Sequence, residues 1–453
     1  MTTILERYRA LHPRSAELHK QATREFPDGV THDIRHFTPF PIYVDHALGC
    51  RKWDVDGNEI IDYMMGHGAL LLGHAHPTLV RAVTRQIAKG THYGASTELE
   101  MEWAGWIRKL VPSAQKVRFH SSGTEATMMA VRLARAYTGR NKLVRFALNF
   151  HGWNDNVVGY VLPEQTVPRS PGIPPAYLGE QIVLPQNDIR ALAMTLSDEK
   201  DVAAVIIEPT GASFSTVPID PEFLAFVRER TAREGVVLIL DEVVTGFRVG
   251  PGGAQAHFSV KPDLTTLGKV LAGGLPGAAV TGRADILDCI EFRRDPEWNA
   301  HRRIAHQGTF NANPLSAAAG VAMLETISDG KPQAHAEEMA KRLCRGANKI
   351  MRKLGVKGCA YTFSSMFHMS IGVDCPEPAD GWEWRWDGDP GATVPMTPPK
   401  VTSAFRQAML NSGGGDFMRT GGLTSAVHTA KDIDQTLAAL EPALSGMKAE
   451  GLL

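Results

Sequence analysis

The sequence lacks the features that would place the protein in a membrane or on nucleic acid. No apolar run approaches the roughly 20 residues that a membrane-spanning helix needs. The first segment, MTTILERYRALHPRSAELHK, is charged throughout and has no hydrophobic region of a secretory signal. Lysine and arginine total 48 against 49 aspartate and glutamate, so there is no basic excess for nucleic acid or an anionic membrane. We therefore expect no membrane and no nucleic-acid partner.

Cysteine is scarce, and no cluster suggests a metal site. The five cysteines form no CxxC motif and no disulfide framework, for which a reducing, cytoplasmic setting is the simplest explanation. They are Cys50, Cys289, Cys344, Cys359 and Cys375. The histidine pair in Gly73-His74-Ala75-His76 has no further ligands at a recognisable spacing, so we expect no bound metal.

The most informative stretch of the chain joins two short strand-like runs to charged residues. The run Val236–Leu240 is β-branched and unalternating, which predicts a strand buried on both faces, and it ends on Asp241 and Glu242. A second run, Leu264–Leu267, is followed by Gly-Lys, so Lys269 also stands near a strand end. Ligands of open α/β sheets bind beyond the carboxyl ends of the strands. A lysine that forms a Schiff base and an acid that pairs with a pyridinium nitrogen are the minimum set for pyridoxal phosphate chemistry.

Strand and helix patterns alternate around this stretch. Strand-like segments 117–119, 142–148 and 201–209 precede it, and a helical pattern separates the first two. This alternation favours an α/β fold with a parallel, doubly wound sheet. Nearer the N-terminus, residues 3–25 predict a helix and residues 42–63 an antiparallel meander.

Two motifs resemble those of a known enzyme family. DEVVTGFR (241–248) followed by PDLTTLGKVLAGGLP (262–276) resembles the class III (fold type I) pyridoxal-phosphate aminotransferases, above all glutamate-1-semialdehyde aminomutase and its aminotransferase relatives. The resemblance runs from about Gly29 to about Leu437. It implies pyridoxal 5'-phosphate as cofactor, a large domain with a doubly wound, mostly parallel seven-stranded sheet, and a small α+β domain built from both termini.

A chain of 453 residues has room for roughly two or three domains. We expect the N-terminal part of the small domain at residues 1–60 and the large cofactor-binding domain at 61–320. The C-terminal part of the small domain is expected at 321–453, where helical segments give way to short strands and a Trp/Pro/Gly-rich loop that includes Trp382, Trp384 and Trp386.

The resemblance gives catalytic roles to two residues. It implies that Lys269 forms the Schiff base with the cofactor and then moves the proton between the substrate Cα and the cofactor C4′. Asp241 would keep the pyridinium nitrogen protonated, and Val243 would pack against one face of the ring. Without the resemblance, Lys269 would read as an exposed loop lysine and Asp241 as a helix cap or ion-pair partner.

Ser122, Gly123 and Thr124 lie between a strand and a helix, where free backbone N–H groups can bind an anion. A plain helix cap explains the same residues equally well. By resemblance to the family's S-G-T-E-A motif, these three residues bind the cofactor phosphate.

Four further residues match cofactor-contacting positions of the family, namely Phe150, His151, Glu208 and Ser213. Phe150, in Phe150-His151-Gly152, stands where the family usually has a stacking tyrosine; stacking survives the change, but a phenolic hydroxyl is lost. Glu208 ends a strand as the family's E-P motif does. At Ser213 the aminomutase has an amide side chain near the cofactor's phenolic oxygen, and serine retains a hydrogen-bond donor.

The segment GTFNANP, which begins at Gly308 and Thr309, matches the family's G-T-(F/L)-x-x-N-P motif. In the family, the threonine reaches the phosphate held by the neighbouring subunit. The resemblance therefore implies a homodimer in which Thr309 completes the partner's site.

Three residues are candidates for substrate contacts. Arg35, in GVTHDIR, and Arg419, in FMRTGGLTSAVHT, stand where relatives bind a substrate carboxylate, which the planar guanidinium fork suits. A surface or interface ion pair is the alternative for each. His67 stands where the aminomutase has a pocket tryptophan, which changes the size and polarity of the wall.

We interpret the chain as an aminotransferase that moves an amino group between a carboxylate-bearing amino donor and an oxo acceptor by a ping-pong mechanism. The alternative with the same cofactor is a 2,1-aminomutase, which transfers the amino group within one molecule. His67, Phe150 and the stretch GGLTSAVHT count against it, whereas the spacing around SPGIPP (170–175) favours it. A relative that only binds the cofactor is disfavoured because Lys269, Asp241 and Thr309 are all retained.

Overall fold

The computed structural model describes residues 2–159, 162, 165, 167–168, 170–384 and 396–453. These residues form two compact units, the central unit (Pro77–Lys331) and the terminal unit (the residues up to His76 and those from Pro332 onward). The expected boundaries at residues 60 and 320 lie earlier in the chain than these limits, and the division into domains stays a prediction. Trp386 lies outside the described residues.

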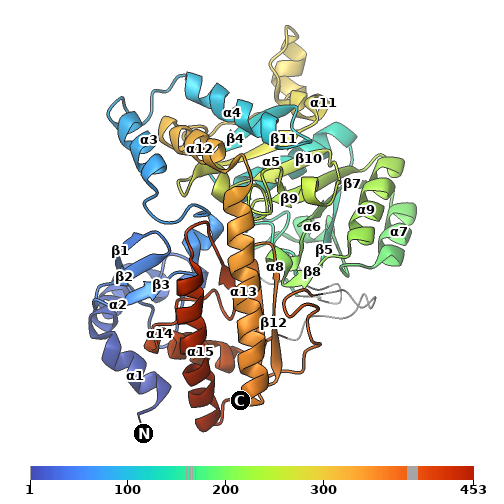
Figure 1. Cartoon of the computed structure of the whole chain (residues 1–453). Helices are drawn as coiled ribbons and strands as arrows, with labels where there is room; N and C mark the ends of the chain where they lie inside the picture. Colours follow the sequence, from blue (N-terminus) through green and yellow to red (C-terminus); the bar gives the residue numbers. More distant parts are fainter. Residues whose placement is uncertain (1, 160–161, 163–164, 166, 169, 385–395) are drawn as a thin grey trace. The chain divides into compact units, whose positions relative to one another are not determined.

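The central unit contains a seven-stranded sheet with the strand order β4-β11-β10-β9-β7-β5-β6 (Figure 1). All neighbouring strands pair in parallel except β11, which is antiparallel to both β10 and β4. The strands are β4 (Lys116–His120), β5 (Lys142–Phe146), β6 (Gln181–Leu184), β7 (Val202–Ile207), β9 (Val237–Glu242), β10 (Leu264–Leu267) and β11 (Ala278–Gly282), with the short β8 (Val217–Pro218) outside the sheet. The predicted fold class is confirmed.

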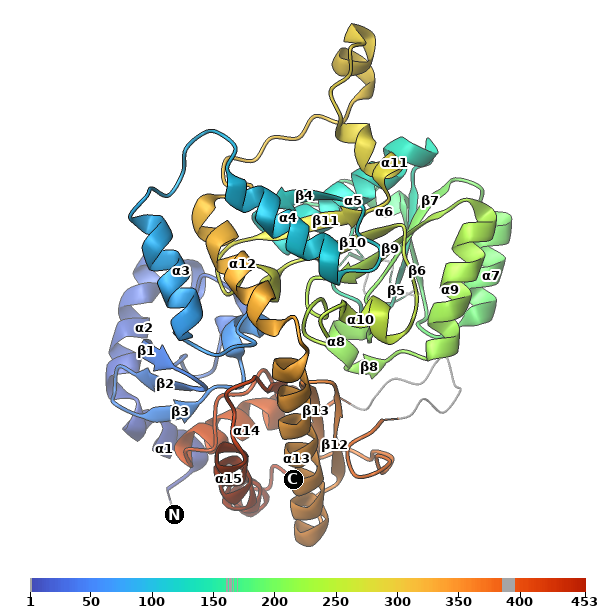
Figure 2. The same ribbon diagram turned by 45° about the horizontal axis from the view of Figure 1, so that its top comes forward.

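Side chains that alternate along the central strands bury both faces of this sheet. Ile206 and Ile239 pack under α5, whereas their neighbours Ile207 and Leu240 pack against α7 and α9. Because successive strand residues point to opposite faces, an unalternating apolar run is what a sheet covered on both sides requires. Figure 2 shows α7 and α9 lying together along one side of the sheet.

The central unit's helices include a group that packs together beside β4. In this group, α12 lies against both α3 and α4. The helices are α3 (Pro77–Ile87), α4 (Glu98–Leu110), α5 (Gly123–Thr138), α6 (Pro175–Gly179), α7 (Ile189–Asp198), α8 (Ala212–Ser215), α9 (Pro221–Glu234), α10 (Gly253–His257), α11 (Ala284–Leu287) and α12 (Pro314–Ile327). Shorter turns are η4 (Lys269–Ala272), η5 (Asp288–Ile290) and the π-helical η6 (Trp298–Arg302).

The terminal unit has two three-stranded antiparallel sheets and a helical core. Its strands are β1 (Val44–Leu48), β2 (Arg51–Asp54), β3 (Glu59–Ile61), β12 (Gly358–Phe363), β13 (Met366–Ile371) and β14 (Gly422–Leu423). Its helices are α1 (Ile4–Leu11), α2 (Pro13–Glu25), α13 (Lys331–Leu354), α14 (Pro399–Asn411) and α15 (Ala430–Ala449), with η1 (Pro27–Gly29), η2 (Asp33–Arg35) and η3 (Met65–Gly68). On α13, Ala340, Leu343, Ala347 and Met351 recur every three or four residues and fill the core.

Two sequence expectations are corrected here. The single helix expected over residues 3–25 is wrong, because the chain leaves helical geometry at His12 and restarts at Pro13, whose missing N–H suits the first position of a helix. The expectation of no disulfides is also wrong for one pair, because Cys359 on β12 is bonded to Cys375 across a Cα–Cα distance of 5.8 Å. Within the described residues, no helix is both long and apolar enough to cross a membrane.

Candidate active site

The ends of two neighbouring parallel strands bring an acid and a threonine together. In the register of β9 with β10, Thr266 lies opposite Asp241. Thr266 Oγ1 donates a 2.8 Å hydrogen bond to Asp241 Oδ1. The two strands thus end at the same edge of the sheet, where the chain continues to Val243 on one side and to Lys269 on the other.

Asp241 is a buried carboxylate with several donors. It is 4% exposed, and besides Thr266 it accepts a hydrogen bond from the Val243 backbone N–H at 3.1 Å. Its Oδ2 lies 2.7 Å from Nδ1 of His151. Burial raises the pKa of Asp241, but the bonds from His151 and the other donors outweigh it and hold the pKa below its ordinary value. The residue is therefore an anion in a buried setting, as pairing with a cationic ring nitrogen requires.

His151 contacts the carboxylate oxygen of Asp241 that Thr266 does not, and its own backbone is held by α5. Thr127 Oγ1 on α5 donates a 2.6 Å hydrogen bond to the His151 carbonyl. The His151 side chain is buried, and its Nε2 has no hydrogen-bond partner among the described residues. His151 therefore contacts the carboxylate that the sequence assigns to the cofactor, while its own contact with a cofactor stays a prediction.

Lys269 has an amine that the rest of the described chain leaves unpaired. Its backbone has φ +48°, which turns the residue out of the line of β10. Within the described residues its Nζ makes neither a hydrogen bond nor an ion pair, and the side chain is partly buried. Burial lowers the pKa of Lys269, against the opposing influence of Asp241 and Glu208. A less basic, unpaired amine is the form that attacks a carbonyl.

Two glycines bring the predicted phosphate-binding residues to the same place as Lys269. A Cβ added to Gly123 would lie 2.7 Å from Val243 Cγ1, and one added to Gly268 would lie 3.2 Å from the same atom. Val243 therefore touches both the start of α5 and the residue before Lys269. The structure thus places Val243 next to Asp241, Gly123 and Gly268, and the roles of these residues and of Lys269 toward a cofactor stay predictions.

The start of α5 leaves two backbone N–H groups free. Glu125 accepts from the N–H groups of Ser121 and Ser122, and Ser122 Oγ accepts from the N–H of Glu125. No described residue accepts from the N–H of Gly123 or Thr124. The helix cap and an anion site are therefore compatible here, because the cap uses other donors than those a phosphate would take.

Glu208 directly follows β7, and Ser213 lies in the short α8 after it. Glu208 is buried and accepts from the Phe214 N–H at 2.9 Å and from Thr210 Oγ1 at 3.1 Å. Burial raises its pKa to about 8, although Lys269 nearby lowers it. Ser213 Oγ donates to the carbonyl of Leu148 at 3.2 Å. The roles predicted for both residues toward a cofactor stay predictions.

The segment after β5 approaches the start of α5. A Cβ added to Gly152, whose φ is +95°, would lie 2.6 Å from Thr124 Oγ1, so only glycine fits there. The neighbouring Phe150 is 58% exposed, and no described ring covers it. An exposed aromatic beside an anion site is consistent with stacking on a planar ligand, which stays a prediction.

Gly308 and Thr309 lie on the surface of the central unit. His92 Nε2 hydrogen-bonds the carbonyl of Thr309, while the Thr309 side chain is exposed. The neighbouring Phe310 is 60% exposed. Exposed side chains at this motif are compatible with the expected reach into a second subunit, which stays a prediction.

The three substrate candidates belong to the terminal unit. Arg35 Nη1 donates to Thr31 Oγ1 at 2.8 Å, and His67 makes a ring contact with His32 at 4.9 Å between centroids. Arg419 is exposed and has φ +58°. Neither arginine forms an ion pair with a described residue of the same chain, and an ion pair across a subunit interface stays the alternative for both. Their contacts with a substrate stay predictions.

Sequence reasoning missed Thr266. Its hydroxyl is fully buried in a strand that is apolar at its ends, Leu264 and Leu267. A polar side chain in such a strand needs a buried partner, and this signal, together with the parallel register, could have pointed to Asp241.

With this geometry established, the comparisons with known proteins decide the family. The family described as "Aminotransferase class-III" matches residues 34–358, which is more than half of the chain. The chain belongs to the class III aminotransferases. Two curated relatives are named glutamate-1-semialdehyde 2,1-aminomutase. The one from Methanopyrus kandleri is 41% identical over 80% of this chain and 83% of its own. The one from Methanothermobacter thermautotrophicus is 37% identical over 96% and 100%.

Several solved structures share the fold over nearly the whole of this chain. An omega-transaminase from Sphaerobacter thermophilus is 31% identical, with TM-score 0.85 and coverage of 96% of this chain and 98% of that one. A transaminase with pyridoxal phosphate bound is 29% identical, with TM-score 0.84 and coverage of 97% and 99%. A glutamate-1-semialdehyde aminomutase from Pseudomonas aeruginosa PAO1 is 25% identical, with TM-score 0.86 and coverage of 98% and 97%.

The described residues of this class III enzyme fit pyridoxal phosphate. The free N–H groups of Gly123 and Thr124 suit its phosphate, and the buried anion Asp241 suits its ring nitrogen. The unpaired amine of Lys269 suits its aldehyde. Val243 lies beside Gly123 and Gly268 and donates its N–H to Asp241, so the three groups come from segments that surround one residue.

Proposed function

We propose that this class III enzyme uses pyridoxal phosphate to transfer an amino group within one molecule, as a 2,1-aminomutase of the glutamate-1-semialdehyde type. The observation that carries the proposal is the identity of 37% over 96% of the chain to a curated aminomutase that the chain covers completely. The comparisons thus favour the alternative of the sequence interpretation over its main form, the intermolecular aminotransferase.

The proposed chemistry assigns each task to a residue of the site. Pyridoxal phosphate, when bound, supplies an electron sink for the charge that develops at the substrate Cα. Lys269 Nζ takes the proton from this carbon, for which its lowered pKa provides the neutral amine. Asp241 holds a proton at the ring nitrogen because its own carboxylate stays ionised. The N–H groups of Gly123 and Thr124 hold the phosphate and so fix the orientation of the ring.

A second candidate is the intermolecular aminotransferase. It is favoured by His67 and Phe150, which stand where the aminomutase has a pocket tryptophan and a stacking tyrosine, and by the 31% identity to an omega-transaminase. Two unpaired arginines, Arg35 and Arg419, would hold a substrate carboxylate in either reaction.

A single half-reaction distinguishes the two candidates. The cofactor-loaded protein is mixed with glutamate-1-semialdehyde, and separately with a panel of α-amino acids, β-amino acids and simple amines, without an oxo acceptor. The proposal predicts that the semialdehyde is converted to its isomer with no net release of oxo product. Stoichiometric release of oxo product from one of the other amines, with the cofactor left in its pyridoxamine form, would establish the aminotransferase instead.

Two finer proposals accompany this function. We propose a homodimer in which Thr309 reaches the partner's phosphate site, supported by the exposure of Thr309 and Phe310. Sedimentation at a range of concentrations tests it.

The proposed cytoplasmic location rests on the scattered cysteines, and the Cys359–Cys375 bond counts against it. Fractionation of the native host tests that proposal.

A further inference from the structure

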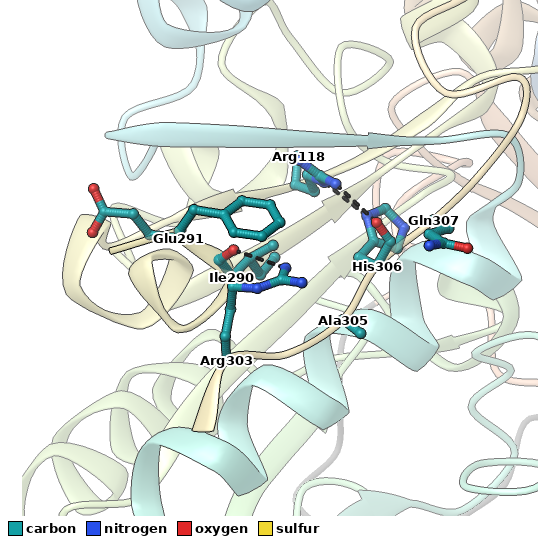
Figure 3. Close-up of a pocket in the computed structure, with 8 residues that line it drawn as sticks. Arg118, Ile290, Glu291, Arg303, Ala305, His306 and Gln307 are labelled. Carbon is teal, nitrogen blue, oxygen red and sulfur yellow. Dashed lines mark hydrogen bonds between the residues drawn. The ribbon is translucent and has the colours of Figure 1, made fainter. Parts of the chain in front are cut away.

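A cavity of about 430 Å³ opens on the central unit beside the outermost strand β4 (Figure 3). Arg118 of β4 forms one wall, and the chain on either side of η6 forms the others. The lining residues are Arg118, Ile290, Glu291, Phe292, Arg303, Ala305, His306 and Gln307. None of them belongs to the site around Asp241 and Lys269, and the cavity is large enough for a small metabolite.

Two arginines of the cavity lack a counter-charge. Among the described residues, neither Arg118 nor Arg303 has a carboxylate partner. The one acid of the lining, Glu291, interacts with Arg293, and its carboxylate is directed away from both guanidinium groups (Figure 3). Half-buried guanidinium groups normally have a carboxylate or phosphate partner. Two of them without such a partner in one cavity therefore indicate a binding site for an anion.

The hydrogen bonds of the two arginines hold their side chains in place and still leave donors free. Arg118 donates from Nε to His306 Nδ1 at 2.7 Å and from Nη2 to the His306 carbonyl at 3.2 Å. Arg303 donates from Nη1 to the carbonyls of Ile290 and Ile304. Its Nε is buried and has no partner among the described residues. Both guanidinium groups are therefore positioned before any ligand arrives.

The two imidazoles near the cavity, His306 and His120, do not offset the charge of the arginines. His306 faces Arg118, Arg132 and Glu125, and its burial together with Arg118 lowers its pKa. His120, next to His306, has its pKa lowered to about 3 by burial and by the nearby His306 and Arg118. Burial lowers the pKa of Arg118, and the nearby positive charge of Arg303 lowers it further. Two positive charges thus stand beside two neutral rings, which an anion between them would compensate.

We propose that this cavity binds a small organic anion, a carboxylate or phosphate carried on an apolar body, between Arg118 and Arg303. The oxyanion accepts hydrogen bonds from the free guanidinium donors, as the planar fork of arginine favours. The apolar body lies against Ile290 and Phe292, the latter of which already packs under Arg303 at 3.8 Å from its ring centroid. The site does not depend on which amino-transfer reaction the enzyme performs.

Calorimetry of the cofactor-loaded protein tests the site with benzoate, phenyl phosphate, inorganic phosphate and the neutral benzyl alcohol as probes. We expect saturable binding of benzoate or phenyl phosphate and none of benzyl alcohol. Arg118→Gln and Arg303→Gln should each weaken binding about tenfold or more, because each removes charge-assisted hydrogen bonds. Tighter binding of phenyl phosphate than benzoate would assign the natural ligand to the phosphate esters, and the reverse to the carboxylates.

Arg293→Gln is the matched control, because Arg293 lies on the same segment, carries the same charge and stacks on Trp298 outside the cavity. Its binding of the anions should equal that of the wild type. Ala305→Phe gives a second approach that leaves every charge in place, because Ala305 is exposed and lines the cavity. It should abolish binding without lowering the melting temperature, which is recorded for all variants.

Three results would overturn the proposal. The first is the absence of saturable anion binding to the wild type. The second is binding that persists in Arg303→Gln and Ala305→Phe and changes the absorbance of the bound cofactor, which would place the anion in the active site. The third is a shift of the monomer–dimer equilibrium in the two arginine variants without anion binding, which would make the cavity a contact between two copies of the chain.

Discussion

His151 and Asp241 are 90 residues apart in the chain, yet Nδ1 of the histidine lies 2.7 Å from Oδ2 of the carboxylate. Thr266 holds the other carboxylate oxygen from the neighbouring strand. The carboxylate therefore has a fixed orientation and stays ionised although it is buried. A fixed buried anion is the electrostatic element on which the proposed chemistry depends.

Replacing Asp241 by asparagine should reduce kcat by roughly 10²–10³-fold, the usual loss for one electrostatic contact in an active site. The amide has nearly the same shape and can still accept from Thr266, so the fold should persist. The measurement is kcat at saturating substrate, with the melting temperature as a check. An Asp241→Asn variant with wild-type kcat would show that the carboxylate does not act on the cofactor.

The adjacent acid Glu242 provides a matched comparison. It is fully buried and accepts from the N–H groups of Ala254 and Gln255 at the start of α10. Glu242→Gln should therefore lower the free energy of unfolding by about 1–3 kcal/mol through a poorly satisfied helix start, with little change in kcat of the folded enzyme. Denaturant titration and kinetics on the same sample measure both. If the activity of this variant fell as far as that of Asp241→Asn, the division of roles between the two acids would be wrong.

Gly123→Ala should weaken cofactor binding, because the new Cβ would lie 2.7 Å from Val243 Cγ1 and push the start of α5 away from the ring site. Overpacking of this kind costs about 1–3 kcal/mol. Val243→Ala in the same chain removes the clash, so the double variant should recover part of the loss. Titration of the apoenzymes with pyridoxal phosphate gives the dissociation constants of the wild type, the two single variants and the double variant. Strictly additive losses would mean that the two residues are not in contact.

Glu208 predicts a specific dependence of stability on pH. Its pKa is raised from 4.5 to about 8, so the folded state favours the protonated form. The stability that it contributes is fully present below about pH 4.5 and is lost as the pH rises toward 8. Glu208→Gln, which resembles the protonated acid, should remove this decline. Urea titrations of both apoproteins across the range measure it, and an equal slope in the two proteins would contradict a raised Glu208 pKa.

The central sheet was predictable where its strands are fully buried. The unalternating apolar runs that became β7 and β9 indicated the parallel core, because a strand covered on both faces has that pattern. Two strands were missed. β6 is a four-residue strand at one end of the sheet, and β11, Ala278–Gly282, consists of small residues that show little strand pattern. The break at Pro13 was also missed, because proline at a helix start resembles the interior of a longer helix until the dihedral angles are known.

Motifs located the site better than they described its contacts. Asp241, Lys269 and the start of α5 could be placed from the sequence, because strand and helix ends fix where backbone and side chains emerge. The partners of Asp241 could not, because the register of two strands and the path of the loop that carries His151 are long-range properties. For Ser213, no pattern of residues indicated that its hydroxyl would donate to the carbonyl of Leu148.

The most direct test of the account is to trap the lysine that carries the cofactor. The loaded enzyme is reduced with borohydride, digested and analysed by mass spectrometry, with Lys261, the nearest other lysine before the strand, as an internal comparison. The account predicts that the pyridoxyl phosphate adduct is found on Lys269, and that Lys269→Ala loses both the adduct and the absorbance of the bound cofactor. An adduct on another lysine, or a Lys269→Ala variant with an unchanged spectrum, would contradict it.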